Sequence, residues 1–242
     1  MAKINQNKCI GCKMCMKYCT VDAIHSDGDK CNINQDECTE CYVCIRQKVC
    51  PRGAIEVSPL DNFYKEFKHM LSDPVENHPV TGVTGRGTEE VKTNDVSGRV
   101  RRGEVGVCID MGRPGLGVFL YDTEKVAMAV CRAGLKLTTP DKSPLSSLMP
   151  DISTGKLKED CLNYRLLSVI IEGKCNESEI NNILLSLKDV ENKIDTVFSV
   201  GIILRVDENG CNNTLNCLND INIPQPYRGK VNVGLGRPLI NK

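Results

Sequence analysis

The sequence predicts an α+β protein in two parts, a small cysteine-rich module at the N-terminus and a larger α/β sandwich domain after it. Nine of the fifteen cysteines fall within the first fifty of the 242 residues. Beyond residue 103, segments with strand and helix patterns alternate. This length leaves about 160 residues for a second domain, which is enough to bury a core. We predict boundaries at 1–58 for the module, 59–79 for a linking helix and 80–242 for the second domain.

Eight of these cysteines form two runs of the same design, each with three cysteines two residues apart and a more distant fourth. The runs are Cys9, Cys12, Cys15 and Cys19, then Cys38, Cys41, Cys44 and Cys50. Three evenly spaced thiolates hold three corners of a [4Fe–4S] cubane, and the distant cysteine of the opposite run holds the fourth. We therefore predict two clusters as cofactors. Their ligands are Cys9, Cys12, Cys15 and Cys50 for one, and Cys38, Cys41, Cys44 and Cys19 for the other.

Two other uses of cysteine compete with this interpretation. Zinc sites are also built from C-x2-C pairs, but the third cysteine of each run is superfluous for them. A disulfide framework needs an oxidising compartment, and we see no secretory signal before the first run. Both alternatives explain the spacing less completely than two clusters do.

The same residues carry a family resemblance, since residues 1–58 resemble a bacterial two-cluster ferredoxin. The segments 21–24 and 52–55 match the repeated tail that follows each run in that family. Thr20 stands where the first run usually has proline, and five residues rather than three separate Cys44 from Cys50. The longer loop bears on cluster shielding and so on reduction potential. We interpret Cys31, on a predicted hairpin strand, as a small buried hydrophobe rather than a ligand.

Composition excludes several classes of function. Lysine and arginine balance aspartate and glutamate at 31 each, and tryptophan is absent. These features argue against a nucleic-acid or membrane surface. No apolar run reaches the length of a membrane span. We expect a soluble, cytoplasmic protein from an anaerobe, because cubanes of this type are sensitive to oxygen.

The linking segment, residues 59–73, has the pattern of a short amphipathic helix with Asp61 as a cap, ended by Pro74 and Pro79. We expect this helix to dock the module against the second domain. Residues 80–103 are polar and rich in glycine. They are either an ordinary surface loop or a backbone nest for an anion.

The second domain is predicted from alternating patterns. Strands are expected at 104–111, 165–172 and 196–206. Helices are expected at 121–133, capped by Asp122 or Thr123, and from Asn176 to about residue 193, with Asn176 and Glu179 as a capping box. Two strand–helix–strand units predict a βαββαβ sandwich with parallel strand pairs.

Residues 85–99, 103–106 and 112–115 resemble the N-terminal half of 6-hydroxynicotinate reductase, in which a ferredoxin-like module precedes such a region and a further domain comes after it. The resemblance implies an electron-transfer subunit of a low-potential reductase that acts on an aromatic hydroxypyridine carboxylate. It also implies a soluble low-potential electron donor and a separate catalytic partner subunit. A role in binding substrate or an anion would fall to Arg86, Lys92, Asn94, Asp95 and Arg113.

Two other functions stay open. The chain is a self-contained iron–sulfur reductase if its substrate site lies between residues 80–117 and the clusters. Because clusters deliver single electrons, reduction of a ring then needs a flavin or a radical intermediate, so a flavin is the further cofactor to consider. The chain also resembles the ferredoxin components of anaerobic sulfur-transfer systems that make homocysteine. We identify no catalytic residues from the sequence.

Overall fold

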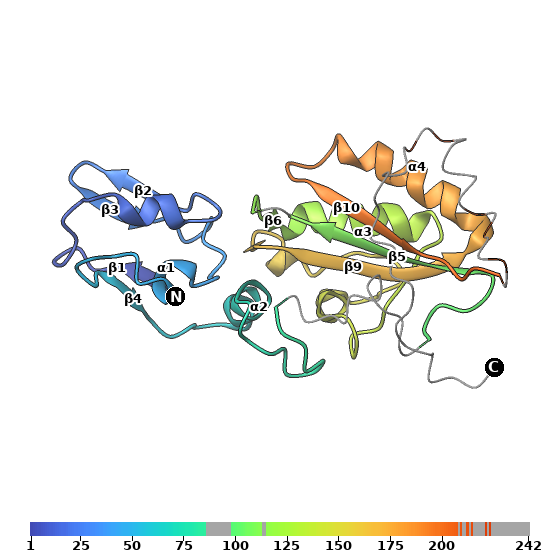
Figure 1. Cartoon of the computed structure of the whole chain (residues 1–242), viewed down its shortest axis with the longest axis horizontal. Coiled ribbons are helices and arrows are strands. Elements are labelled where there is room, and N and C mark those ends of the chain that lie inside the picture. Colours follow the sequence, from blue (N-terminus) through green and yellow to red (C-terminus); the bar gives the residue numbers. More distant parts are fainter. Residues whose placement is uncertain are drawn as a thin grey trace.

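The computed structural model describes residues 1–85, 98–112 and 115–207, together with positions 209, 212, 214, 221 and 223. The cysteine-rich N-terminal unit lies at one end of the molecule and a larger sheet-and-helix unit at the other, with one helix between them (Figure 1).

Two antiparallel pairs of strands form the sheets of the N-terminal unit. Strand β1 (Ala2–Ile4) pairs antiparallel with β4 (Ile55–Val57), and β2 (Ile24–Asp27) pairs antiparallel with β3 (Lys30–Ile33). The 3-10 helix η1 (Met14–Tyr18) and the short α-helix α1 (Val43–Arg46) coincide with the third position of each cysteine run. The unit is therefore built from two halves that repeat the same loop, helical turn and strand.

Helix α2 (Phe63–Ser72) occupies the linking segment and begins four residues later than the sequence predicts. Its cap is Asn62, whose side chain accepts a hydrogen bond from the backbone N–H of Lys65 at 3.0 Å. The predicted cap, Asp61, instead forms an ion pair with Lys65 at 2.7 Å. The helix contacts both units. Lys68 and His69 reach carbonyl oxygens of Gln35 and Glu40, and Tyr64 packs on Tyr164 with 5.3 Å between ring centroids.

The larger unit contains a four-stranded sheet in the order β10-β5-β9-β7, and every neighbouring pair is antiparallel. The strands are β5 (Glu104–Met111), β7 (Lys136–Leu137), β9 (Val169–Asn176) and β10 (Phe198–Ile203). The two predicted parallel pairs, β5 with β7 and β9 with β10, are present, but their strands are not neighbours in the sheet. In each strand–helix–strand unit, one strand of the other unit lies between the two parallel strands, which is a split β-α-β arrangement.

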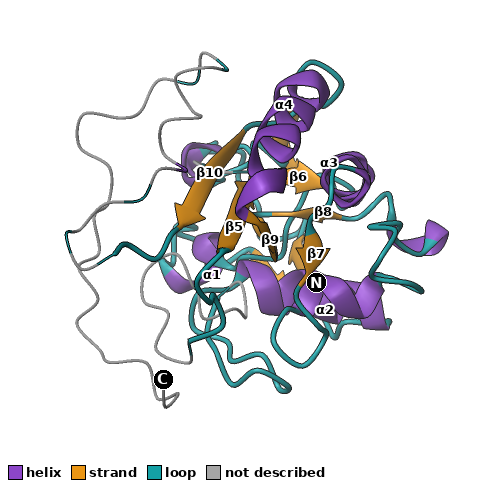
Figure 2. Cartoon of the chain, turned by 90° about the vertical axis from the view of Figure 1, so that its right-hand side faces the viewer, coloured by secondary structure: helices purple, strands orange, loops and turns teal. Residues whose placement is uncertain are grey.

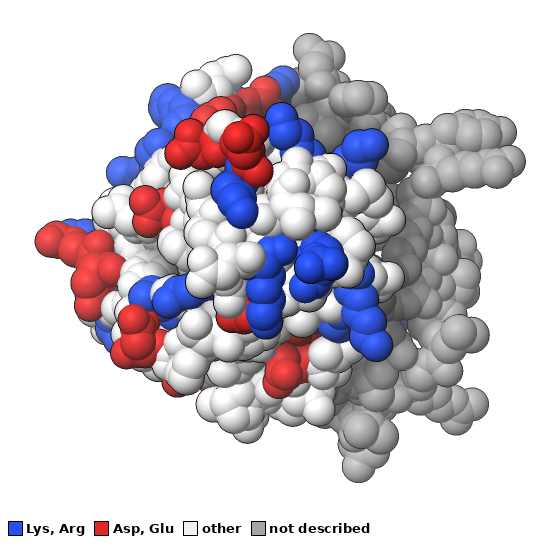
Figure 3. Space-filling view, turned by 90° about the vertical axis from the view of Figure 1, so that its left-hand side faces the viewer, with Lys and Arg blue, Asp and Glu red and all other residues white. Residues whose placement is uncertain are grey.

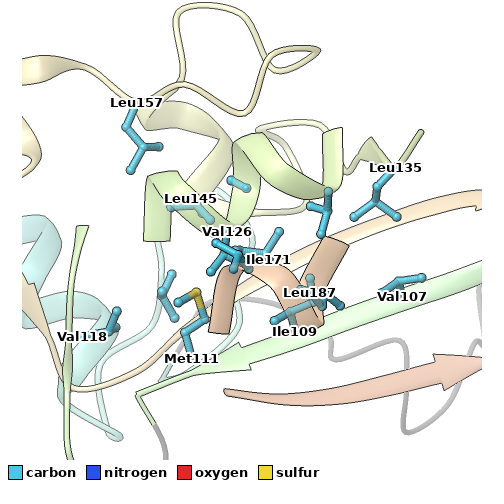
Figure 4. Packing of buried hydrophobic residues seen from close by; sticks show 14 of the residues in the cluster. Val107, Ile109, Met111, Val118, Val126, Leu135, Leu145, Leu157, Ile171 and Leu187 are labelled. Carbon is cyan, nitrogen blue, oxygen red and sulfur yellow. The ribbon is translucent and has the colours of Figure 1, made fainter. Parts of the chain in front are cut away.

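Helices α3 (Leu120–Arg132) and α4 (Ile180–Glu191) lie side by side over one face of this sheet (Figure 2). Strand β5 alternates accordingly, with Val105, Val107, Ile109 and Met111 turned into the core that the two helices cover. Figure 4 shows Val107, Ile109 and Met111 facing Val126 of α3 and Leu187 of α4. The other residues of β5, Glu104, Gly106, Cys108 and Asp110, belong to the opposite face.

Other boundaries differ from the prediction for local reasons. The predicted strand 165–172 is broken into β8 (Arg165–Leu166), which pairs with β6 (Val118–Phe119), and β9. The N–H of Leu167 bonds to Ser72 of α2 at 3.1 Å and so leaves the ladder. Helix α3 has no side-chain cap, and its Asp122 is buried, paired with Lys125 at 2.8 Å. The capping box of Asn176 and Glu179 is confirmed, and it precedes the short η4 (Glu177–Glu179) that leads into α4.

Between β7 and β8 the chain forms two 3-10 helices, η2 (Pro144–Leu148) and η3 (Glu159–Cys161). Among the described helices, none has the length and apolar character needed to cross a membrane.

Candidate iron–sulfur centres

The two predicted cysteine sets line two separate cavities in the N-terminal unit. One cavity is lined by Cys9, Cys12, Cys15 and Cys50, and the other by Cys19, Cys38, Cys41 and Cys44. In each cavity, three thiols come from one run and the fourth from the opposite run. Within the described residues, no three His, Cys, Asp or Glu side chains are placed to hold a single metal ion. Thiols arranged around a shared volume fit a polynuclear cluster, whose ligands bind separate corners.

Left-handed backbone turns bend the two cysteine loops at matching positions. Between the first two cysteines of each run, Gly11 has φ +67° and Glu40 has φ +54°. One position after the second cysteine, Lys13 and Tyr42 have φ +60° and +53°. Residues other than glycine rarely adopt this left-handed backbone conformation. Its recurrence at equivalent positions therefore indicates a backbone shape that both loops require.

The two distant cysteines accept backbone hydrogen bonds in the same way. The N–H of Ala23 donates to Sγ of Cys19 at 3.1 Å, and the N–H of Ala54 donates to Sγ of Cys50 at 3.2 Å. Hydrogen bonds to sulfur stabilise negative charge on it, and they are one of the ways in which proteins set the potential of a cluster.

Apolar side chains surround the two cavities, and the burial that they cause changes the pKa of several thiols. Burial raises the pKa of Cys15 and of Cys38 to about 12, and that of Cys44 to about 11. Backbone hydrogen bonds from Cys31 and Gly11 lower the pKa of Cys9. A buried apolar setting of this kind also excludes water from a bound cluster.

Sequence reasoning missed two charged residues beside the second cavity. Glu40 is 1% exposed, and its Oε2 accepts a hydrogen bond from the N–H of Ala2 at 2.8 Å, while its Oε1 has no hydrogen-bond partner within the described part of the chain. Lys68 of α2 is 4% exposed, and desolvation lowers its pKa. After desolvation, Glu40 is the next cause that raises the pKa of Cys38. The available signal was the glutamate at the position that Gly11 takes in the first run.

Cys31 takes a position that the sequence did not predict. It is buried on β3, as expected, but it also lines the first cavity, so five cysteines surround that space. Of the six later cysteines, four are described and lie buried or half-buried at separate points of the larger unit: Cys108, Cys131, Cys161 and Cys175.

The residues predicted to bind a substrate or anion lie outside the described residues. They are Arg86, Lys92, Asn94, Asp95 and Arg113.

The second cavity lies on the side of the N-terminal unit that meets the larger unit. Arg165 of β8 forms an ion pair with Glu37 and donates to the carbonyl oxygen of Val21 at 3.3 Å. Its other terminal nitrogen donates to the carbonyl oxygen of Leu116 at 2.6 Å. Val21 lines the second cavity, so Arg165 ties the wall of this cavity to the larger unit.

The geometry of the first cysteine run agrees with a family match, since residues 2–25 match the model of the 4Fe-4S binding domain. Residues 2–25 are a ferredoxin-type segment. The match contains Cys9, Cys12, Cys15 and Cys19, and it supports 4Fe–4S cluster binding and a role in iron–sulfur electron transfer. Comparisons with curated proteins and with solved structures found no match.

Proposed function

We propose that the chain binds two [4Fe–4S] clusters and transfers single electrons between a donor and a catalytic partner. The observation that carries this proposal is the internal repeat of the N-terminal unit. The half outside the family match, with Cys38, Cys41 and Cys44, has the same backbone turns as the matched half. Its distant cysteine, Cys50, accepts the same kind of N–H bond as Cys19. Four cysteines of the two runs line each cavity, which is the number of ligands that a cubane takes, and Cys31 adds a fifth thiol to the first cavity.

The two cavities have different surroundings, and these suggest a direction of flow. Cys12 of the first set is exposed, and the loop around it exposes Ile10 by 60% and Met14 by 41%. The end of the molecule formed by this unit carries Lys and Arg side chains near its middle, with Asp and Glu mainly toward its upper and left edges (Figure 3). A soluble donor would reach the first cluster there. The second cluster would pass electrons toward the larger unit, to which Arg165 ties its cavity wall.

The catalytic step belongs, in this proposal, to a low-potential anaerobic reductase of the 6-hydroxynicotinate reductase type. The reductase type rests on the sequence resemblance of residues 85–115, and the electron-transfer role rests on the cysteine geometry. When bound, the clusters supply one-electron chemistry. The chain's own residues bind them, exclude water and hold them beside the larger unit.

The test is anaerobic purification of the full chain with whatever binds it, followed by assays of iron, sulfide and flavin and identification of bound proteins. We expect about eight irons per chain, the content of two cubanes, together with a stoichiometric partner chain and no flavin. Turnover by the isolated chain with a bound flavin would contradict the subunit role and indicate a self-contained reductase. Loss of sulfur assimilation in a deletion strain would instead indicate a sulfur-transfer component.

A further inference from the structure

The larger unit contains a cavity of about 410 Å³ that shares no residue with the cysteine cavities. Its floor lies on the face of the sheet opposite α3 and α4. There Cys108 pairs in register with Glu172, and Gly106 pairs with Lys174. A Cβ atom on Gly106 would lie 2.7 Å from Cγ2 of Val100, so glycine allows the 98–101 segment to close one side. The volume lies within the range of pockets that hold small molecules.

Positive charge dominates the wall of this cavity. Among the residues that the structure describes, five cationic residues line it, against one carboxylate; the cations are Arg99, Arg101, Lys136, Lys142 and Lys174, and the carboxylate is Glu172. Lys174 is partly neutralised by Glu104, at 2.8 Å from Oε1. Glu172 is 3% exposed and accepts a hydrogen bond from the Cys108 thiol at 3.3 Å, which places the one carboxylate of the described lining at the floor.

Neutral groups complete the cavity. Thr138 and Thr139 add hydroxyl groups near Lys142, and Val100, Leu137 and Ile203 add apolar surface. The carboxylate of Asp141 lies outside the lining, where a hydrogen bond with Thr139 lowers its pKa. The cavity therefore combines cations and hydroxyls, which recognise oxyanions, with apolar surface for a carbon skeleton.

We propose that this cavity binds a small organic anion, with its carboxylate or phosphate group held by Lys136 and Lys142 and its carbon skeleton on Leu137 and Ile203. The site goes beyond the electron-transfer role, because it contains none of the eight predicted cluster ligands. Its failure would therefore leave the iron content and the proposed function untouched.

The test is titration calorimetry on the anaerobically purified full chain, at fixed ionic strength, with inorganic phosphate and benzoate as separate probes. We expect saturable binding of at least one probe at one site per chain. Binding of phosphate alone would identify a phosphate-bearing ligand, and binding of benzoate alone a carboxylate. The double variant Lys136→Glu/Lys142→Glu should weaken this binding at least tenfold.

A matched control separates this site from general charge effects. The double variant Lys158→Glu/Lys193→Glu makes the same change in net charge at two exposed lysines outside the cavity, and it should bind the probe as the unaltered chain does. The single variant Lys142→Glu changes a loop residue, so it should disturb folding less, and it should also weaken binding of the probe. Absence of saturable binding by both probes, or equal weakening in both double variants, would overturn the proposal.

Discussion

Gly11 and Glu40 occupy equivalent positions in the two cysteine loops, but Gly11 permits close packing, whereas Glu40 introduces a carboxylate. Gly11 lies against the hairpin turn of β2 and β3, where a Cβ atom would come within 2.1 Å of the carbonyl oxygen of Asp29. Glu40 places a buried carboxylate next to Cys41. The two loops therefore share a backbone shape, while only the second has an acidic group beside its cavity.

The charge of Glu40 should influence the second cluster, next to Cys38, more than the first. A negative charge disfavours the added electron, so Glu40→Gln should raise the reduction potential of the second cluster by on the order of 50 mV. This is close to a tenfold change in the equilibrium constant of a one-electron couple. Potentiometric titration followed by electron paramagnetic resonance measures this. Glu56→Gln, which changes an exposed residue on β4, should leave both potentials unchanged. Equal shifts of both clusters in Glu40→Gln would contradict this assignment.

Replacement of Gly11 tests the close packing of the first loop. Gly11→Ala should lower the iron content and the melting temperature, because the new Cβ overlaps backbone that cannot move aside cheaply. The matched control is Gly53→Ala, where φ is +58° and nothing lies within 4 Å of the new Cβ. That variant should cost about 1 kcal/mol of stability from backbone strain alone and keep its iron. Iron assays and thermal unfolding distinguish the two, and equal losses would contradict the argument.

At the scale of elements, α2 shows how a single cap fixes where a helix begins. Asn62→Ala should destabilise the protein by about 1 kcal/mol, because the backbone N–H of Lys65 loses its acceptor. Asp61→Ala removes an exposed ion pair with Lys65, which solvent screens, and should have little effect on stability. Denaturant unfolding of both variants gives the comparison. If Asp61→Ala lost more stability than Asn62→Ala, Asp61 rather than Asn62 would be the helix cap, as the sequence alone predicts.

Local patterns predicted the elements that local contacts determine. The capping box before α4 and the alternation of β5 are of this kind, because neighbouring residues supply them. The break between β8 and β9 could not be predicted from the local pattern, because it depends on Ser72 in α2, which is distant in the sequence. The antiparallel order also depends on which strands meet, and the period of a strand does not reveal that.

The same limit applies to the candidate site. Three ligands of each set were predicted from their spacing within one run, and the fourth from the pattern in which the distant cysteine of the opposite run completes the cluster. Cys31 and Lys68 were missed as neighbours of the cavities, since only the fold brings β3 and α2 against the cysteine loops. Glu40 lies within the second run, but its burial is set by the fold.

At the scale of the whole molecule, Arg165 is a main contact between the two units. Arg165→Ala removes an ion pair and two hydrogen bonds to carbonyl oxygens, and it should cost about 1–3 kcal/mol and speed proteolysis between the units. The control Lys156→Ala removes an exposed ion pair with Glu159 and should have little effect. Denaturant unfolding and limited proteolysis measure both changes. Unaltered proteolysis of Arg165→Ala would contradict a main role for Arg165 in holding the units together.

The central claim is that the N-terminal unit binds two separate cubanes, each with its own four thiolates. The most direct test is the iron and sulfide content of Cys15→Ala, Cys44→Ala and the double variant, purified anaerobically beside the unaltered chain. We expect about eight irons in the unaltered chain, about four in each single variant and almost none in the double variant. About four irons in the unaltered chain, or full iron content in Cys44→Ala, would contradict the second cluster.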